Sequence, residues 1–586
     1  MKVFKTGLIG IMAVLSIQCL AQPVIYVNQV GFDTHSPKIA VVALDAGDKV
    51  SQFHVVNTIN SKIVFGGKLG KSQKIEEWIP GKLFCRADLS AFDTPGQYKL
   101  QVTAAGKNYW SAPFQIGDNL LAKLTIPAIL HYYRNQRANT PAELEADSHL
   151  LLYGSDQRVD LHGGWCDASG DVSKYFSHLA YANYMSPQQT PLVTWSLINT
   201  AEKLPKLLSK LGVTDSIRDE AFWGADYMMR CLSKEDYFYM IVFSYFNKDP
   251  NARRVVGLHA NSVTTNEYQC AFREGGGMAI AALARISQWK THGEYTQAQY
   301  LDAAKRAFAH LLVNNTRYDD DGKENIIDDY CALMAATELW KATGNELYAA
   351  EARKRAGKLE QRLTPFGYFS ANDAGRPYWH ASDAGLPIVA LLGYAEKESD
   401  GTLHQRAVNM IEQALNDNLA ITGRVINPFG YARQTFSYKG TVKDGFFIPH
   451  DNETGWWWQG ENARLGSLAT AALTGRKVAN DVKRGALSAF AYNQLNWILG
   501  CNPYNMCFMY GFGVNNVPYM SSNFGHGSQR GGISNGITGK EGNGEGRGID
   551  FKTSAQGNEW RWTEQWIPHA AWFLQAVTAM AEHDGN

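Results

Sequence analysis

Residues 163–171 read Gly163-Gly164-Trp165-Cys166-Asp167-Ala168-Ser169-Gly170-Asp171, and Lys174 and Tyr175 follow closely. The two aspartates are separated by three small residues. Gly and Ser favour turns over helix interiors, so we expect a tight loop that points both carboxylates into one space, with Asp171 capping a helix that follows. Two close carboxylates suit the activation of a water molecule. An isolated Asp-x-x-x-Asp is more often a simple turn with a cap, so other segments must decide between the two interpretations.

A second motif lies near the other end of the chain, where Thr563-Glu564-Gln565-Trp566-Ile567-Pro568-His569-Ala570-Ala571 opens the last predicted helix. The first motif resembles the catalytic-base loop of the family 9 glycoside hydrolases, the inverting cellulase family, whose usual form is Asp-Ala-Gly-Asp, so Ser169 is an insertion. The second resembles the general-acid segment of that family, with Glu564, Ile567 and Ala571 in register. The resemblance implies inverting hydrolysis with Asp167 and Asp171 on the base side and Glu564 as the acid.

The chain from residue 117 to residue 586 reads as helical. Apolar residues recur at spacings of three and four and predict twelve helices, the first over 118–135, one over 190–211 and the last over 564–582. Twelve is the number in an (α/α)6 barrel, the all-α fold that the resemblance implies.

Residues 22–116 predict a small all-β domain before the barrel. Short β-branched or alternating runs recur at 24–27, 38–42, 52–56, 62–65, 97–102 and 110–116, with turn formers between them. This spacing favours an immunoglobulin-like sandwich. Val27–Phe32 and Pro95–Tyr98 resemble the N-terminal module of many family 9 enzymes, which we expect to support the catalytic domain.

Residues 1–21 are predicted to be a signal peptide, with Lys2 and Lys5 before an apolar centre and Cys19-Leu20-Ala21 as a small-residue cleavage pattern. The apolar centre is too short to span a membrane. We therefore expect a periplasmic or secreted protein with no membrane insertion.

The composition favours a carbohydrate partner over a charged one. Lys plus Arg and Asp plus Glu both number 56, so no net charge recruits nucleic acid or an anionic membrane. Aromatic residues make up 12% of the chain, and flat rings stack on sugars, although a large aromatic core explains the same excess. The seven cysteines after residue 21 form no disulfide framework or zinc pattern. The oligomeric state is not set by the sequence.

One segment departs from the family. Leu499–Pro503 and Gly511–Gly513 resemble its Leu-Gly-x-Asn-Pro and Gly-Phe-Gly pieces, but Val517–Asn523 stands where a Pro-His-x-Arg clamp on the substrate is usual. His526 and Arg530 follow a few residues later. The missing clamp and the long loops at 425–461 and 514–563 predict a pocket closed at one end, and hence an exo-acting enzyme.

Several loop segments mix aromatic rings with hydrogen-bonding groups and are candidates for substrate binding. Each of these residues is about as often a structural residue as a ligand contact. Trp456, Trp457 and Trp458 cannot all face one core, because neighbouring side chains point apart. The candidates are Trp165, Tyr175, Trp379, His380, Asp383, His450, Glu453, Trp456, Trp457, Trp458, Asn523, His526 and Trp562.

The acidic run Tyr318–Asn325 lacks the ligand spacing of an EF-hand, so a solvated turn is favoured over a calcium site. The resemblance implies that no cofactor is required for the chemistry and is compatible with structural calcium, whose site the sequence does not place.

These observations predict an inverting glycoside hydrolase that cleaves β-linked glucan-type polysaccharides or oligosaccharides from chain ends. An exo-β-glucosaminidase on chitosan oligosaccharides is an alternative, because Asp451, Glu453 and Glu461 would suit a cationic amino sugar. A non-catalytic carbohydrate-binding protein would keep the aromatic residues but has little reason to keep Asp167, Asp171 and Glu564 together. A purely structural surface protein needs neither the aromatic residues nor these carboxyls.

Overall fold

The computed structural model describes residues 22–178, 188–244, 253–259, 263–452, 455–456, 459–521, 525–554 and 559–584. The predicted signal peptide, residues 1–21, lies outside them. Within these ranges no helix is both long and apolar enough to cross a bilayer.

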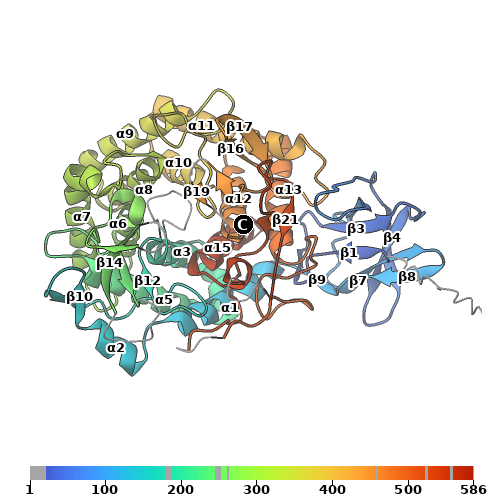
Figure 1. Ribbon diagram of the computed structural model, residues 1–586, viewed down its shortest axis with the longest axis horizontal. Helices are drawn as coiled ribbons and strands as arrows, with labels where there is room; N and C mark the ends of the chain where they lie inside the picture. The colour runs from blue at the N-terminus through green and yellow to red at the C-terminus, as the bar shows by residue number, and fades with distance from the viewer. Residues whose placement is uncertain are drawn as a thin grey trace, which may run out of the picture.

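The N-terminal part is a β-sandwich of two sheets (Figure 1). One sheet has the strand order β1-β3-β6, and the other has the order β2-β9-β7-β4-β5, with β8 on β7. The strands are β1 (Val24–Tyr26), β2 (Gly31–Asp33), β3 (Ile39–Asp45), β4 (Gln52–Asn57), β5 (Ile63–Lys68), β6 (Lys82–Asp88), β7 (Gly96–Ala104), β8 (Lys107–Trp110) and β9 (Phe114–Gly117).

Side-chain alternation explains how the sandwich builds its core. In β7 the buried residues are every second one, Tyr98, Leu100, Val102 and Ala104, as a strand with one face on a core requires. Three strand predictions were wrong. The sequence analysis missed β2 and β6, and its single strand over 110–116 is two strands, separated by a segment that includes Pro113, which has no N–H for a ladder.

The C-terminal part is a barrel of two concentric rings of helices (Figure 1). Each inner helix contacts the next one, and the last inner helix contacts the first, so the ring closes. Each inner helix also packs against an outer helix. The inner helices are α3 (Thr190–Lys203), α6 (Gly276–Ile286), α8 (Ile326–Thr343), α10 (Leu386–Lys397), α12 (Asn462–Gly475) and α15 (Ile567–Asp584). The outer helices are α1 (Leu120–Gln136), α5 (Thr214–Cys231), α7 (Gln297–Tyr318), α9 (Glu346–Arg362), α11 (Gly401–Gly423) and α13 (Asp481–Ile498).

The helix predicted over 190–211 is two helices. The inner helix α3 ends at Lys203, and α4 (Pro205–Leu211) begins at Pro205. Proline lacks the N–H of a helix interior and clashes with the preceding turn, whereas it fits the first position of a new helix. The chain therefore breaks at Leu204 and turns toward α5.

Each outer helix brings the chain back to the end of the barrel where the next inner helix begins. The six inner helices therefore run in one direction, and their N-terminal ends lie at one rim of the barrel. The segments before these ends carry the short elements. These are η3 (Phe272–Glu274), α2 (Pro141–Asp147), α14 (Trp560–Thr563), β10 (Leu150–Leu152), β11 (Arg158–Val159), β12 (Lys174–Tyr175), β13 (Ile241–Phe243), β14 (Arg254–His259), β15 (Val263–Thr265), β16 (Gln434–Tyr438), β17 (Thr441–Gly445), β18 (Asp451–Asn452), β19 (Gly455–Trp456), β20 (Thr538–Gly539) and β21 (Ile549–Asp550).

The sandwich has a hydrophobic core of its own, and a second set of its apolar side chains joins the core of the barrel. Trp78 of the sandwich packs on Phe446 and Trp497 of the barrel, with ring centroids 5.0 and 5.5 Å apart. Its indole N–H donates to the backbone carbonyl of Arg547 (2.7 Å). The side chain of Gln29 also enters the barrel, where its Oε1 accepts the backbone N–H of Val514 (3.0 Å). The sandwich thus contacts segments that lead to the rim of the barrel.

Candidate active site

The loop at 163–171 and the segment at 563–567 lie side by side at the rim, although they come from distant parts of the chain. The backbone N–H of Ser169 donates to the carbonyl of Gln565 (2.9 Å), and the N–H of Gln565 returns a bond to Ser169 Oγ (2.9 Å). The N–H of Ile567 donates to the carbonyl of Asp167 (3.1 Å). Ser169, the apparent insertion, is therefore a bridge between the loop and the segment that carries Glu564.

The loop turns because of its small residues. Gly170 has φ of +95°, a conformation that side-chain-bearing residues rarely adopt, and the N–H of Asp171 closes a turn onto Ala168 (3.2 Å). Asp171 Oδ1 then accepts the N–H groups of Val172 (2.6 Å) and Ser173 (2.9 Å). The prediction of a helix after Asp171 was wrong, because the short strand β12 follows. The cap-like bonds are those of an Asx-turn, and they fix one carboxylate oxygen of Asp171.

Asp167 is almost fully buried beside two other carboxyls. Burial, followed by the nearby charges of Asp171 and Glu564, raises the pKa of Asp167 well above its usual value. The three groups therefore share one electrostatic environment, in which they cannot all ionise easily.

Glu564 follows the short helix α14 and precedes α15, so its side chain stands at the rim. Its Oε2 accepts the indole N–H of Trp566 (2.5 Å). Burial raises the pKa of Glu564 to about 8, with a further rise from the charge of Asp171 and an opposing effect from the Trp566 bond. A carboxyl with this pKa keeps its proton at neutral pH and can donate it.

His178 is a residue of this site that the sequence analysis missed. Its ring lies between two aromatic rings, 4.3 Å from Tyr175 and 5.3 Å from Trp566 by ring centroids, and both are nearly parallel to it. Its Nδ1 lies 3.9 Å from Asp167 Oδ2. Burial lowers the pKa of His178 to about 4, so the ring is neutral at ordinary pH. His178 lies three residues beyond the quoted motif, and no pattern in the sequence marked it.

Three of the predicted aromatic residues are buried among protein groups. Trp165 is completely buried and its indole N–H donates to Glu220 Oε2 (3.1 Å). Trp562 is buried and donates to Thr538 Oγ1 (3.0 Å). Trp379 packs in a small apolar cluster with Phe436.

His380 and Asp383 precede the inner helix α10. His380 Nδ1 accepts the N–H groups of Ser382 and Asp383 (both 3.0 Å), and Asp383 Oδ1 accepts the indole N–H of Trp572 (3.0 Å). Burial raises the pKa of Asp383 to about 7. Their other polar atoms, His380 Nε2 and Asp383 Oδ2, are buried with no hydrogen-bond partner among the described residues, as are both ring nitrogens of His569 in α15.

The remaining candidates divide into two groups. Glu453, Trp457, Trp458 and Asn523 lie outside the described residues, and Trp456 is described by its backbone alone, in β19. His450 and His526 are buried. Both ring nitrogens of His526 face protein atoms, Nδ1 toward the carbonyl of Asn135 (3.0 Å) and Nε2 toward Glu143 Oε1 (2.6 Å).

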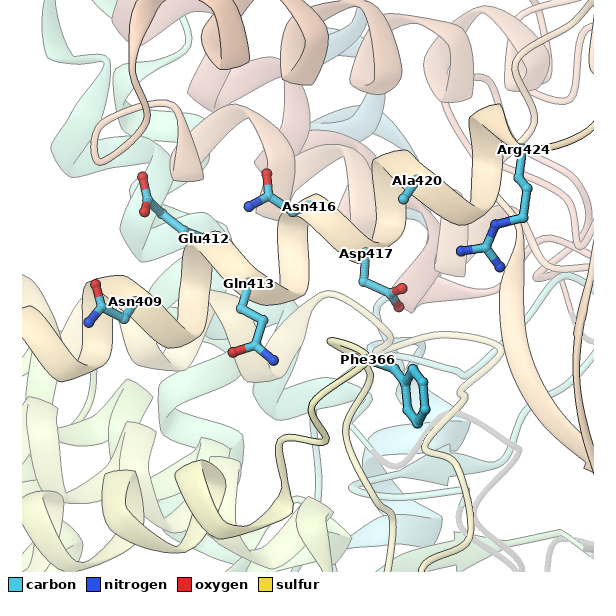
Figure 2. Close-up of a pocket in the computed structure, with 8 residues that line it drawn as sticks. All are labelled: Phe366, Asn409, Glu412, Gln413, Asn416, Asp417, Ala420 and Arg424. Atoms are coloured by element: carbon cyan, nitrogen blue, oxygen red, sulfur yellow. The ribbon is translucent and has the colours of Figure 1, made fainter.

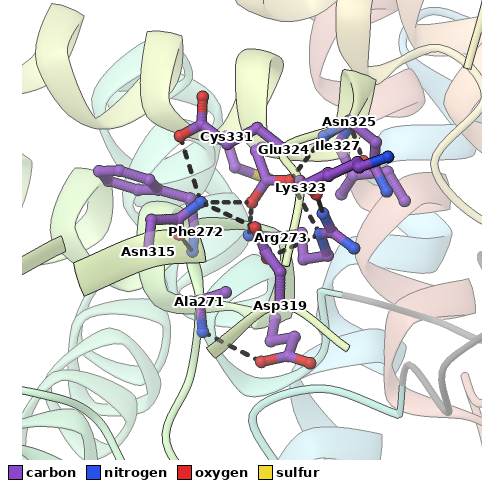
Figure 3. A network of polar contacts seen from close by, with 12 residues as sticks. Ala271, Phe272, Arg273, Asn315, Asp319, Lys323, Glu324, Asn325, Ile327 and Cys331 are labelled. Atoms are coloured by element: carbon purple, nitrogen blue, oxygen red, sulfur yellow. Dashed lines mark hydrogen bonds and ion pairs between the residues drawn. The ribbon is translucent and has the colours of Figure 1, made fainter. Parts of the chain in front are cut away.

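The acidic run at 318–325 is an exposed turn at residues 320–323, as expected, but its first aspartate is buried. The side chains of Asp319 and Asp328 are completely buried around the guanidinium of Arg273, whose Nε lies 3.0 and 2.8 Å from them. Figure 3 shows Arg273 and Asp319 within this network of polar contacts. Glu324 pairs with Arg355 (2.9 Å). Arginine side chains occupy the position that a cation would take, so these residues do not fit calcium.

A hollow of about 400 Å³ lies on the outer helix α11, lined by Phe366 and by polar side chains such as Gln413 and Asp417 (Figure 2). None of its lining residues belongs to the motifs at 163–171 and 563–567. The carboxyl cluster at the rim is therefore the stronger candidate for the active site.

Comparisons with known proteins agree with this geometry. Residues 124–545 match the family model of glycosyl hydrolase family 9, and residues 20–107 match that of the cellulase N-terminal ig-like domain. A xyloglucan-specific endo-β-1,4-glucanase of Bacteroides ovatus is 25% identical over 447 residues, which cover 67% of this chain and 72% of the relative. A cellodextrinase of Butyrivibrio fibrisolvens is 24% identical over 526 residues, 83% and 85% of the two chains.

Several solved structures have the same fold as this chain. A metagenome-derived glycoside hydrolase family 9 endoglucanase superposes with a TM-score of 0.67 at 18% identity, covering 96% of this chain and 99% of the other. A family 9 protein of Bacteroides ovatus gives 0.65 at 19% identity, with the same coverage. An immunoglobulin-like sandwich, an (α/α)6 barrel and a family match over most of the chain lead to one conclusion. This chain belongs to glycosyl hydrolase family 9.

Proposed function

We propose that this enzyme is an inverting β-glucanase in which Asp171 is the general base, Glu564 is the general acid and Asp167 helps to hold the attacking water. The observation that carries the proposal is the direct hydrogen bonding between the loop of Asp167 and Asp171 and the segment of Glu564. A carbohydrate-binding protein would have no need to hold three carboxyls in one partly buried space, where their mutual repulsion is costly.

The proposed reaction is a single displacement. Asp171 takes a proton from the water molecule as the water oxygen bonds to the anomeric carbon. The bond from that carbon to the leaving sugar oxygen breaks, and Glu564 gives its proton to that oxygen. The two amide bonds to Asp171 Oδ1 leave Oδ2 free to face the water. Because the water enters opposite the leaving group, we expect the base and acid carboxyls to be about 6.5–9.5 Å apart and the product anomer to be inverted.

We propose a neutral β-linked glucan chain or oligosaccharide as the substrate, in line with the relatives named above. An amino sugar needs a carboxylate that is free to pair with its ammonium group. Glu461 is not free, because its Oε2 pairs with Arg464 (2.8 Å) and its Oε1 accepts the N–H of Ile448 (3.1 Å). The side chain of Asp451 and the whole of Glu453 lie outside the described residues, so the preference for a neutral chain rests on Glu461 and on the relatives.

We further propose that the enzyme acts on chain ends. The support comes from the sequence, in which Val517–Asn523 stands where the family usually carries a clamp on the substrate, and long segments at 425–461 and 514–563 precede the inner helices α12 and α15. His526 is bonded to Glu143 and Asn135, which leaves this histidine unable to replace the missing clamp on a long chain.

The test is a product profile on soluble mixed-linkage β-glucan, cello-oligosaccharides and chitosan oligosaccharides. We expect small sugars to appear while the viscosity of the polymer falls slowly, and the first anomer detected by NMR to be inverted. A rapid fall in viscosity with long products would contradict end-on action. A retained anomer would contradict the assignment of Asp171 as base.

We propose no cofactor for the chemistry, since both proton transfers are made by side-chain carboxyls. We also propose that the protein is exported, with residues 1–21 as the signal. Every described cysteine is a free and buried thiol, an arrangement that keeps unpaired thiols away from oxidants outside the cytoplasm.

A further inference from the structure

A short turn between α9 and α10 displays an aromatic ring to solvent. Its sequence is Thr364-Pro365-Phe366-Gly367, and the N–H of Gly367 donates to the carbonyl of Thr364 (3.0 Å). Proline and glycine are ordinary turn residues, whereas a phenylalanine between them is not. The side chain of Phe366 is 78% exposed, which makes it the most exposed aromatic ring among the described residues.

The turn is fixed against the outer helix α11. Gly367 has φ of +105°, and a Cβ at this position would lie 2.6 Å from the Cβ of Asp417, so the close approach requires glycine. Gln413 Nε2 donates to the carbonyl of Thr364 (2.8 Å). The backbone that carries Phe366 is therefore held in place, and an aromatic group that is already positioned loses little freedom when it binds a ligand.

A second ring lies parallel to the first. The planes of Phe366 and Tyr368 differ by 6°, and their centroids are 6.3 Å apart. Flat aromatic faces stack on the flat faces of sugar rings. Two parallel rings on one turn therefore suit a chain of sugars better than an apolar ligand of irregular shape.

The ring of Phe366 faces polar groups across the hollow of about 400 Å³ on α11 (Figure 2). We call it the α11 hollow, and we define it by Phe366, Gln413, Asp417 and Arg424. Figure 2 shows Gln413 and Asp417 extending from α11 on the side where Phe366 lies. The half-buried carboxyl of Asp417 accepts no hydrogen bond from the described residues, and burial raises its pKa to about 6. This carboxyl is available to a ligand that donates hydrogen bonds.

The lining of the α11 hollow favours a neutral ligand that is rich in hydroxyl groups. Carboxyl and amide groups accept hydrogen bonds from hydroxyls, and amide and guanidinium groups donate to them. Arg424 pairs with Asp444 (2.9 Å), so no unpaired positive charge among the lining residues attracts a phosphate or an anionic polymer. A docked helix or strand of another protein needs several apolar pockets in a row, whereas the lining offers one aromatic ring and Ala420.

The α11 hollow lies close to segments that lead to the rim. The turn with Phe366 is followed by residues 369–385, which run to the start of the inner helix α10. Asp417 also lines a smaller hollow of about 60 Å³, together with Trp379 of that segment and Arg464 of α12. A chain bound at Phe366 is therefore near the mouth of the barrel.

We propose that the α11 hollow is a second carbohydrate-binding site, which holds a neutral β-glucan chain by stacking on Phe366 and by hydrogen bonds to Gln413 and Asp417. The choice of a β-glucan rests on the proposed function, whereas the site itself rests on the turn and on α11. Binding here keeps the polymer close to the mouth of the barrel and raises its local concentration. The site takes no part in the proton transfers.

The test is affinity electrophoresis of the full-length protein in native gels that contain mixed-linkage β-glucan. All variants carry Asp171→Asn, so the polymer stays intact. We expect Phe366→Ala and Asp417→Ala each to weaken binding by about fivefold or more. Phe366→Leu should weaken it as much as Phe366→Ala, because leucine is apolar but not flat, whereas Phe366→Tyr keeps the ring and should bind normally.

Trp110→Ala is the matched control, because it removes an exposed ring from β8 of the sandwich and should leave binding unchanged. Normal binding by Phe366→Ala, equal losses in Phe366→Ala and Trp110→Ala, or normal binding by Phe366→Leu would overturn the proposal. Sedimentation that shows a dimer in the unaltered protein and a monomer in Phe366→Ala would also overturn it, because the ring would then contact a second copy of the chain.

Hydrolysis measurements separate this site from the glucanase assignment. In enzyme that retains Asp171, Phe366→Ala should lower kcat/KM on the polymer by about fivefold more than on cellotriose, which is too short to occupy both sites. Equal losses on the two substrates would contradict the second site while leaving the glucanase assignment intact. If neither substrate is hydrolysed, the glucanase assignment is wrong, and the electrophoresis alone decides whether the α11 hollow binds the polymer.

Discussion

The indole N–H of Trp566 should help to set the pH at which Glu564, the proposed general acid, loses its proton. It donates to Glu564 Oε2 (2.5 Å) and lowers the pKa of a carboxyl that burial raises to about 8. A hydrogen bond to a charged group contributes about 1.5–3 kcal/mol, roughly twice the value for the neutral form. Trp566→Phe therefore costs the carboxylate about 1–1.5 kcal/mol more than the acid. At 1.36 kcal/mol per pKa unit, the pKa of Glu564 should rise by about one unit.

The assay is kcat/KM on a soluble cello-oligosaccharide from pH 5 to pH 10. The general acid works only when protonated, so activity is lost as pH rises through the pKa of Glu564. We expect the basic limb near pH 8 in the unaltered enzyme and about one unit higher in Trp566→Phe, with the rate on the plateau changed by less than about threefold. Trp562→Phe is the matched control, because the indole of Trp562 donates to Thr538 instead. An unmoved limb, or one shifted to lower pH, would refute the reasoning.

Other perturbations test the remaining parts of the site and the fold. Glu564→Gln should lose about 10²–10⁴-fold in activity on natural substrates, but far less on substrates whose leaving group needs no proton. Asp171→Asn should be inactive on both types of substrate. Equal losses of activity across both types would argue against these roles. His178→Gln removes the ring beside Asp167, and kcat should fall about 10-fold or more with KM little changed; a change in KM alone would point to a role in binding. Arg273→Met leaves buried carboxylates without their partner, so it should reduce the free energy of unfolding by about 3–5 kcal/mol. The control Arg306→Met removes a more exposed ion pair and should reduce that free energy by less than about 1 kcal/mol. Urea denaturation of both variants measures the difference.

Much of the architecture was accessible from the sequence because it rests on local periodicity. Apolar spacings of three and four predicted the helices of the barrel, and alternation predicted most strands of the sandwich. The break at Pro205 was missed although proline is a strong helix breaker, because an apolar period continues on both sides of it. Strand β6 was missed because charged residues interrupt its apolar pattern, and its pairing with β3 is a tertiary feature.

The site was less accessible because its contacts join distant segments. The motifs named Asp167, Asp171 and Glu564, but nothing in the sequence indicated that Ser169 bonds to Gln565 or that His178 is stacked on Trp566. The burial of Asp319, at the start of the acidic run at 318–325, was missed for the same reason. The positive charge that pairs with Asp319 belongs to Arg273, which lies before α6 and far from the run in the chain.

The apolar contact between the sandwich and the barrel has a consequence for how such proteins can be rebuilt. Modules joined by a flexible linker can be exchanged between enzymes, since each keeps its own interior. Here Trp78 completes the interior of its neighbour, so removing the sandwich would expose Phe446 and Trp497 and create a cavity in the catalytic domain. The two parts should melt in a single transition, and any chimera must take both sides of this contact from one parent.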